Sequence, residues 1–174
     1  MPDKVNGGLA NLPADCILRH IMRHDIRPAD PTDPQSLASM QDYFAELAAI
    51  FPQGFDPGPL TEESLSSMRA PDGLFLLAFD GRTAIGCVGL RREDATTGEV
   101  KRLWVAPAAR QSGLARALMA EIETKARTMG LSRLVLDTSR HLPKAVAFYH
   151  RQGWTEIARY NDNPYAHHFF EKRL

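Results

Sequence analysis

A hairpin followed by a strand-helix-strand unit is the feature that most restricts how this chain folds. Residues 74–80 and 83–92 both have strand character, and Asp80-Gly81 between them is typical of a tight hairpin turn. A further strand over 98–107 precedes a helical segment and a short, nearly continuous apolar strand over 131–138. Because a strand-helix-strand crossover places its two strands in parallel, the pattern predicts a sheet with both antiparallel and parallel neighbours.

Helix signals occupy most of the remaining chain. Asp33 is an N-cap candidate ahead of Pro34, and the apolar residues that follow recur at three- and four-residue steps as far as Phe51. A cap at Thr61 predicts a second, short helix, while residues 51–60 carry three prolines and two glycines and must form a loop. The helices are expected from Pro34 toward 51, over 61–69, from 114 to a stop at Gly130, and over 144–152 between Pro143 and Gly153.

The two ends of the chain complete the expected fold. Residues 1–14 are aperiodic and are interpreted as a flexible tail, residues 16–26 as a first strand, and residues 154–160 and 166–174 as the last two strands. Together these elements predict a single domain over 15–174. Its fold is α/β (α+β), with a mixed, mostly antiparallel sheet of six to seven strands and helices on both faces.

Composition limits the classes of protein that remain. The 174 residues include 21 basic and 21 acidic side chains, and this neutral balance argues against nucleic acid or an anionic membrane as partner. Two isolated cysteines do not make a disulfide scaffold or a zinc site, so a reducing, cytoplasmic setting is expected. No stretch approaches the roughly 20 apolar residues that span a bilayer.

The junction at residues 105–119 carries the main functional signal. A strand ends at Pro107, a glycine-containing turn follows over 110–115, and a helix begins at once. The first amides of that helix have no intrahelical partners and lie at the positive end of the helix dipole, which is a favourable place for a phosphate. The lack of bulk at Gly113 and Ala115 would let a phosphate approach the main chain, with the charge of Arg110 nearby.

Five segments in order resemble the GNAT superfamily of N-acetyltransferases. The pyrophosphate signature of that superfamily, Arg/Gln-x-x-Gly-x-Gly/Ala, matches Arg110-Gln111-Ser112-Gly113-Leu114-Ala115. The other four segments are GCVGLR of the hairpin, GEVKRLWVAP, LVLDTS, and AVAFYHRQGW with its tyrosine. The resemblance covers about residues 16–174, and it implies that the two parallel strands splay apart.

The resemblance implies acetyl-CoA as donor, held by the junction and by the end of the strand before it. Pantetheine would pair with that strand end as an added strand does. The donor-binding residues implied are Leu103, Trp104, Val105, Arg110, Gln111, Ser112, Gly113, Leu114, Ala115 and Tyr149. The sequence departs from the family pattern at Leu142, where many members have an asparagine that contacts pantetheine.

Two catalytic roles are carried over from the family. Tyr149 matches the tyrosine whose hydroxyl meets the coenzyme sulfur, and a phenol can donate a proton to a departing thiolate; the alternative is a core tyrosine. Glu99 is the candidate base, acting through water, because an alkyl amine must lose a proton before it attacks; the alternative is an exposed glutamate at a strand edge. Cys87 has no activating base nearby, so direct transfer is expected rather than an acyl-cysteine intermediate.

The acceptor is expected to be a small molecule or amino acid derivative with a primary amine. Residues 51–60 and 159–168 would surround its mouth, with Phe51, Phe55, Tyr160 and Asn163 as binding residues. Transfer to a protein or to an aminoacyl-tRNA stays open as an alternative, as does a non-catalytic acyl-CoA sensor. His167 and His168 are adjacent on a strand and make a poor chelate, so no metal is expected. Pairing of exposed strands would allow a homodimer.

Overall fold

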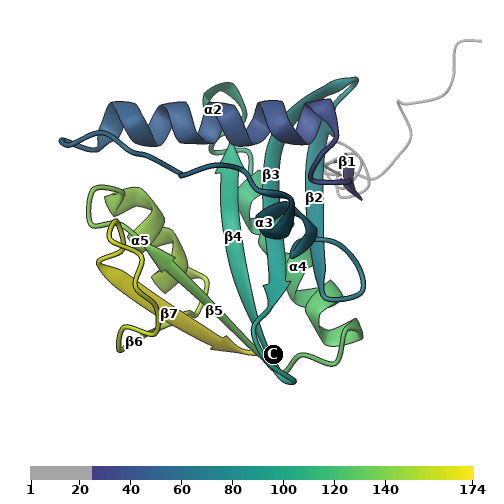
Figure 1. The fold of residues 1–174 in the computed structure, drawn as a ribbon, viewed down its shortest axis with the longest axis vertical. Coiled ribbons are helices and arrows are strands. Elements are labelled where there is room, and N and C mark those ends of the chain that lie inside the picture. Colours follow the sequence, from purple (N-terminus) through teal and green to yellow (C-terminus); the bar gives the residue numbers. More distant parts are fainter. Residues whose placement is uncertain (1–24) are drawn as a thin grey trace, which may run out of the picture.

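The computed structural model describes residues 25–174, and it builds them around one seven-stranded sheet (Figure 1). The strand order is β1-β2-β3-β4-β5-β7-β6, and every neighbouring pair is antiparallel except β4 and β5. The mixed, mostly antiparallel sheet predicted from the sequence is therefore confirmed. The strands are β1 (Asp25–Pro28), β2 (Gly73–Asp80), β3 (Thr83–Arg92), β4 (Thr97–Val105), β5 (Arg133–Thr138), β6 (Thr155–Ile157) and β7 (His168–Arg173).

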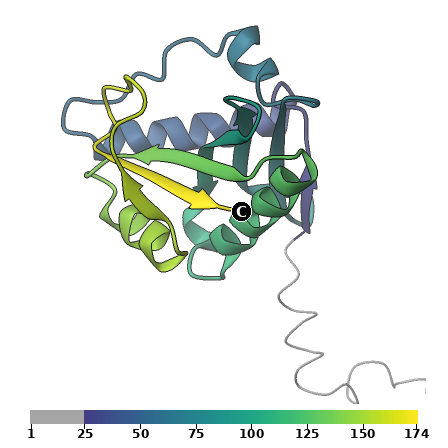
Figure 2. The ribbon, with the colours of Figure 1, turned by 90° about the horizontal axis from the view of Figure 1, so that it is seen from below.

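The helices cover the sheet on both faces, as Figure 2 shows from below. The four α-helices in the described part of the chain are α2 (Pro34–Ile50), α3 (Glu62–Ser66), α4 (Leu114–Thr128) and α5 (Pro143–Arg151). Apolar side chains of α2 and α3, among them Met40 and Leu65, form one buried cluster against the sheet. A second cluster on the opposite face joins α4 and α5, and Leu118 and Ile122 are fully buried in it.

Most element boundaries follow the local signals. Asp33 stands at the N-cap of α2, although its side chain accepts a bond from the Asp30 amide rather than capping the helix. Thr61 caps α3 by accepting from the Ser64 amide at 3.1 Å. The hairpin turn lies at Asp80-Gly81 as expected, with Gly81 at φ +59°.

The differences lie near the termini. The last strand pair is shorter than expected, because β6 ends at Ile157 and residues 158–160 leave the sheet. The predicted strand over 16–26 overlaps the described residues only at Asp25 and Ile26, which begin β1. The tail predicted over 1–14 lies outside the described residues.

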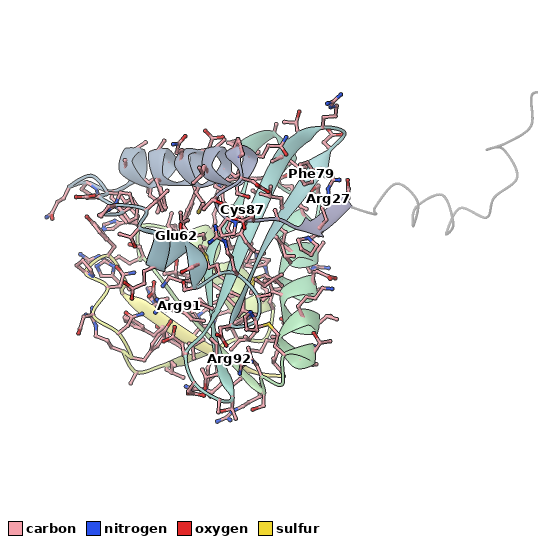
Figure 3. The ribbon with its side chains drawn as sticks, turned by 45° about the vertical axis from the view of Figure 1, so that its right-hand side comes forward. Arg27, Glu62, Phe79, Cys87, Arg91 and Arg92 are labelled. Carbon is pink, nitrogen blue, oxygen red and sulfur yellow. The ribbon has the colours of Figure 1, made fainter. Side chains whose placement is uncertain are left out.

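Arg27 of β1 packs over the ring of Phe79 in β2, 4.1 Å from its centroid (Figure 3).

The parallel pair is joined over a short length only. β4 and β5 pair at 97–99 with 133–135, although β4 continues to Val105 and β5 to Thr138. Beyond Glu99 the two strands separate, which confirms the expected splay. A bulge in β4 accompanies the separation, since its register against β3 shifts between Cys87 and Gly89. Arg102 lies in the bulge with a left-handed backbone at φ +58°.

Candidate active site

Two cavities occupy the region where β4 and β5 separate. The loop cavity, of about 540 Å³, is lined by residues 55–58 and 163–166 together with side chains of α2, β4 and β5. The turn cavity, of about 740 Å³, lies between α2, the end of β4, the turn at 109–116 and α5. Both cavities are lined by Tyr43, Leu47, Leu103, Leu142, Ala145 and Tyr149. The two cavities therefore meet at the splay.

The turn before α4 presents main-chain amides that have no partner among the described residues. Gly113 and Gln111 both take left-handed backbone angles, at φ +86° and +65°. Ser112 Oγ donates to the Ala109 carbonyl at 2.7 Å and accepts from the Leu114 amide at 3.3 Å, which fixes the turn. In the described residues, the amides of 111, 112, 113, 115 and 116 have no hydrogen-bond partner. A phosphate fits such unpaired donors at the N-terminus of a 15-residue helix.

Arg110 lies in this turn, and its guanidinium is already paired with the carboxylate of Glu46. Its Nη2 is 2.5 Å from Glu46 Oε2, and its Nε donates to the Val105 carbonyl at 3.0 Å. The sequence predicted that Arg110 adds a positive charge near the turn, and in the structure its guanidinium also connects the turn to α2 and to the end of β4. Glu46, 64 positions away in sequence, gave no signal of its own.

The end of β4 offers a free main-chain edge toward the cavities. Trp104 and Val105 pair with Cys87 and Gly86 of β3 on one side, and the edge toward β5 is unpaired after Glu99. The side chains of Trp104 and Val105 are buried, while Leu103 lines both cavities. This arrangement leaves peptide-like donors and acceptors available beside the turn.

Tyr149 of α5 lies where the cavities meet. Only 7% of it is exposed, and its ring packs against Trp154 and Phe170. Its hydroxyl makes no hydrogen bond to any described residue. Burial raises the pKa of Tyr149 above its ordinary value, so the phenol is protonated at neutral pH.

Glu99 is buried in the loop cavity rather than exposed at a strand edge. One per cent of it is accessible, and its carboxylate accepts from Lys101 Nζ and from the Tyr160 hydroxyl, each at 2.9 Å. It also forms an ion pair with Arg91, whose Nε lies 3.0 Å away. Burial opposes ionisation of Glu99, but Lys101, Arg91 and Tyr160 outweigh it and hold its pKa below the ordinary value. The carboxylate is therefore charged at neutral pH.

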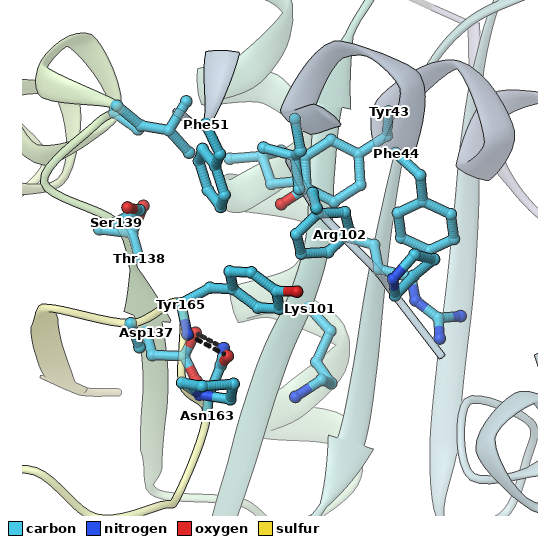
Figure 4. Close-up of a pocket in the computed structure, with 18 of the residues that line it drawn as sticks. Tyr43, Phe44, Phe51, Lys101, Arg102, Asp137, Thr138, Ser139, Asn163 and Tyr165 are labelled. Atoms are coloured by element: carbon cyan, nitrogen blue, oxygen red, sulfur yellow. Dashed lines mark hydrogen bonds between the residues drawn. The ribbon is translucent and has the colours of Figure 1, made fainter. Parts of the chain in front are cut away.

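The expected acceptor residues divide into two groups. Phe51, Phe55 and Asn163 line the loop cavity. Tyr160 is not among the lining residues, because its hydroxyl is directed to Glu99. Asn163 donates to Asp137 Oδ1 at 2.9 Å, a contact visible in Figure 4.

A sequence model of the Acetyltransferase (GNAT) family matches residues 40–154, which is most of the chain described here. This chain belongs to the GNAT acetyltransferase family. An "IAA acetyltransferase" from Azospirillum brasilense is 35% identical to this GNAT enzyme over 114 residues, covering 63% of this chain and 74% of that protein.

Solved structures agree on the fold. A putative acyl-CoA N-acyltransferase from Klebsiella pneumoniae superposes with a TM-score of 0.69 at 26% identity, over 88% of this chain and 99% of the other. The PaiA N-acetyltransferase from Thermoplasma acidophilum, solved in complex with coenzyme A, gives a TM-score of 0.65 at 20% identity, over 87% and 99%.

Several cavity residues of this GNAT enzyme were not found by sequence reasoning. Tyr43, Arg102 and Asp137 line the loop cavity, and only Asp137, at the end of an apolar strand, had a position that could have indicated a site. Leu142 lines both cavities, at the N-cap of α5 where it makes no side-chain cap bond. An asparagine there would have been able to cap the helix or bond to a ligand.

Two further observations concern metals and membranes. In residues 25–174 no three His, Cys, Asp or Glu side chains converge as a metal site would require. His167 contacts Ser139 and His168 contacts Glu156, so the two rings have separate partners. None of the helices in that range is long and apolar enough to cross a bilayer.

Proposed function

We propose that this enzyme transfers the acetyl group of acetyl-CoA to the primary amine of a small molecule or amino acid derivative, by direct attack in a ternary complex. The observation that carries the proposal is the meeting of the two cavities at Tyr149 and Leu103. A donor in the turn cavity and an acceptor in the loop cavity would bring thioester and amine together at that point. Holding both reactants in one geometry is itself a large part of catalysis.

The turn cavity suits the donor. Its unpaired amides at 111–113 and 115 match a pyrophosphate, and the free edge of β4 at 103–105 matches the amide groups of pantetheine. The coenzyme A complex of the Thermoplasma relative supports the same donor class. Arg110 would hold the turn in place. Its positive charge would be available to the pyrophosphate only when the ion pair with Glu46 opens.

The transfer requires one bond to form and one to break. The amine nitrogen attacks the thioester carbonyl carbon, the carbon–sulfur bond breaks, and the sulfur leaves with the electron pair. Tyr149 donates its proton to that sulfur as the acid, the amine nitrogen loses its proton to water beside Glu99, and a proton returned from this water restores the Tyr149 hydroxyl. Because the pKa of Glu99 is low, its main contribution is to orient the water and to stabilise the positive charge on the amine.

Direct attack is supported by the state of Cys87. This thiol is buried and lines neither cavity, and burial raises its pKa to about 12. It donates to the Arg102 carbonyl at 3.3 Å. A protonated thiol away from the cavities is a poor candidate for carrying an acyl group.

A small acceptor is supported by the size of the loop cavity. A volume of 540 Å³ falls in the range of about 300–1,000 Å³ typical of small-molecule sites. The name of the Azospirillum relative also points to a small acceptor. A protein or an aminoacyl-tRNA would have to present its amine past two loops that contact each other, since the Asp56 amide donates to the Tyr165 hydroxyl at 3.0 Å.

The test is calorimetric titration with acetyl-CoA, followed by thiol release against a panel of amines, amino acids, peptides and charged tRNA. Binding together with turnover of a small amine supports the proposal. Binding without acceleration by any acceptor would favour an acyl-CoA sensor. A preference for peptides or charged tRNA would reject the small-molecule acceptor while keeping the transferase.

A further inference from the structure

Arg102 is a half-buried cation with no acidic partner among the described residues. It is the one Arg or Lys in residues 25–174 that is neither solvent-exposed nor within 4 Å of a carboxylate. Its neighbour Lys101 is, by contrast, engaged by Glu99 at 2.9 Å. A guanidinium removed from water is destabilised unless an anion or a set of good acceptors replaces the lost hydration.

The contacts that Arg102 makes are weak ones. Its Nη1 meets the thioether sulfurs of Met40 and Met68, and its guanidinium lies over the ring of Phe44, 5.7 Å from the centroid. A thioether is a weak acceptor, and the other donors of the guanidinium have no partner among the described residues. Burial also lowers the pKa of Arg102 below its ordinary value, because partial removal from water disfavours the charged guanidinium.

The position of Arg102 indicates where its partner comes from. The β4 bulge holds its backbone at φ +58°, an angle that a non-glycine residue adopts at some cost. Arg102 lines the loop cavity and is not among the residues of the turn cavity, where the phosphates of the donor are expected. The missing anion therefore belongs to the acceptor.

The surroundings of Arg102 restrict the rest of that acceptor. Figure 4 shows Arg102 beside Tyr43 and Phe44 on the α2 side of the cavity, across from Asp137 and Ser139. Phe51 and Phe55 continue this apolar wall, with ring centroids 5.7 Å apart. A flat or branched apolar body would fit against these rings.

We infer that the acceptor is an amine that also bears a carboxylate, and that Arg102 binds this carboxylate while the apolar body of the acceptor lies on the wall of Tyr43, Phe44, Phe51 and Phe55. The inference rests on the proposed function. It goes further by making Arg102 the residue that selects the acceptor. A guanidinium suits the task because its planar donors match the two oxygens of a carboxylate.

The first test measures binding without turnover. Phenylacetate and phenylacetamide have the same shape and differ in charge, so calorimetry compares them on the wild type, on Arg102→Gln and on the exposed control Arg82→Gln. We expect phenylacetate to bind the wild type and the control at least about tenfold more tightly than the amide, as for hydrogen bonds to charged groups. The preference should disappear in Arg102→Gln and persist in part in Arg102→Lys. Equal binding of the two probes to the wild type would overturn the inference, whether or not the variants fold.

The second test uses turnover and separates the inference from the proposed function. L-Phenylalanine and phenethylamine share an amine and an aromatic body, and only the first has a carboxylate. Faster acetylation of L-phenylalanine that Arg102→Gln abolishes supports the inference. Preference for phenethylamine would overturn it and leave the transferase intact. Retained phenylacetate preference without acetylation of any amine in the panel would support the anion site and reject the amine transfer.

Discussion

Arg110 in the turn before α4 forms an ion pair with Glu46 of α2, with Nη2 and Oε2 2.5 Å apart. The same carboxylate oxygen accepts from Trp104 Nε1 at 3.0 Å. One side chain of α2 thus holds both the end of β4 and the turn before α4. It also places a negative charge on the wall of the turn cavity, where an anionic donor is expected to bind.

Glu46→Gln removes this charge, while its amide oxygen can still accept from Trp104. We expect acetyl-CoA to bind about two- to fivefold more tightly at low salt, the range of exposed ion pairs, and the gain to shrink as salt screens the charges. Titration calorimetry at two salt concentrations measures it, with Glu63→Gln on the exposed side of α3 as control. Weaker binding would mean instead that the pair is needed to hold the turn.

Tyr149→Phe removes a hydroxyl that has no hydrogen-bond partner among the described residues. We expect kcat to fall about 100-fold, as for the loss of a proton donor, with the affinity for acetyl-CoA and the melting temperature nearly unchanged. Steady-state kinetics and thermal denaturation are the measurements. Tyr43→Phe, a second tyrosine that lines both cavities, provides the comparison. Equal losses of kcat in the two variants would remove the specific role of Tyr149.

Glu99→Gln leaves Lys101 and Arg91 beside a neutral side chain. Both cations are about one-third exposed, at 33% and 39%, so water compensates part of the lost interaction. We expect a loss of about 2 kcal/mol in the free energy of unfolding, as for hydrogen bonds to a charged group, measured by chemical denaturation. Glu93→Gln, whose side chain is 33% exposed and contacts only Arg91 in this group, should have a smaller effect.

The lowered pKa of Glu99 predicts a pH dependence of stability. A carboxylate that ionises more readily in the folded state contributes stability above its unfolded pKa of about 4.3. That contribution is lost as the pH falls through the lower pKa of the folded state. We therefore measure the denaturation midpoint from pH 7 to pH 3. Below pH ~4.3, the midpoint should decrease less steeply in Glu99→Gln than in the wild type. Parallel curves for the two proteins would contradict the ion-pair assignment.

Gln111 has a left-handed backbone at φ +65°, where glycine has no steric penalty. We expect Gln111→Gly to raise the free energy of unfolding by up to about 1 kcal/mol, since the relief of strain is partly offset by the greater freedom of glycine in the unfolded chain. Gln111→Ala keeps the penalty and serves as the matched control. Chemical denaturation of both variants checks the prediction, and a gain in the alanine variant would assign the effect to the lost side chain instead.

Local patterns predicted the elements of the sheet and the turn before α4, because each was encoded in consecutive residues. The hairpin followed from Asp80-Gly81 and α5 from Pro143 and Gly153. The overestimate of β6 has a non-local cause, since Tyr160 turns away from the sheet to reach Glu99, 61 positions earlier.

The parts of the site that escaped prediction depend on contacts distant in sequence. The sequence singled out Glu99 as a candidate base, but its burial beneath Tyr160, 61 positions later, could not be predicted from it. No glycine in the sequence indicates the bulge at Arg102, and the bulge is recognised only from the register of β4 against β3. Contacts between elements, which local patterns do not encode, therefore determine the surroundings of these side chains.

The short pairing of β4 with β5 has a consequence for solubility. An unpaired strand edge normally invites another chain to add to it and begin aggregation. In this enzyme the free edge of β4 faces inward, toward cavities lined by side chains of α2 and α5, and not outward at the rim of the sheet. The proposed pantetheine arm is slender enough to lie beside such an edge, whereas a whole β-strand from a neighbouring molecule would have to displace helices first.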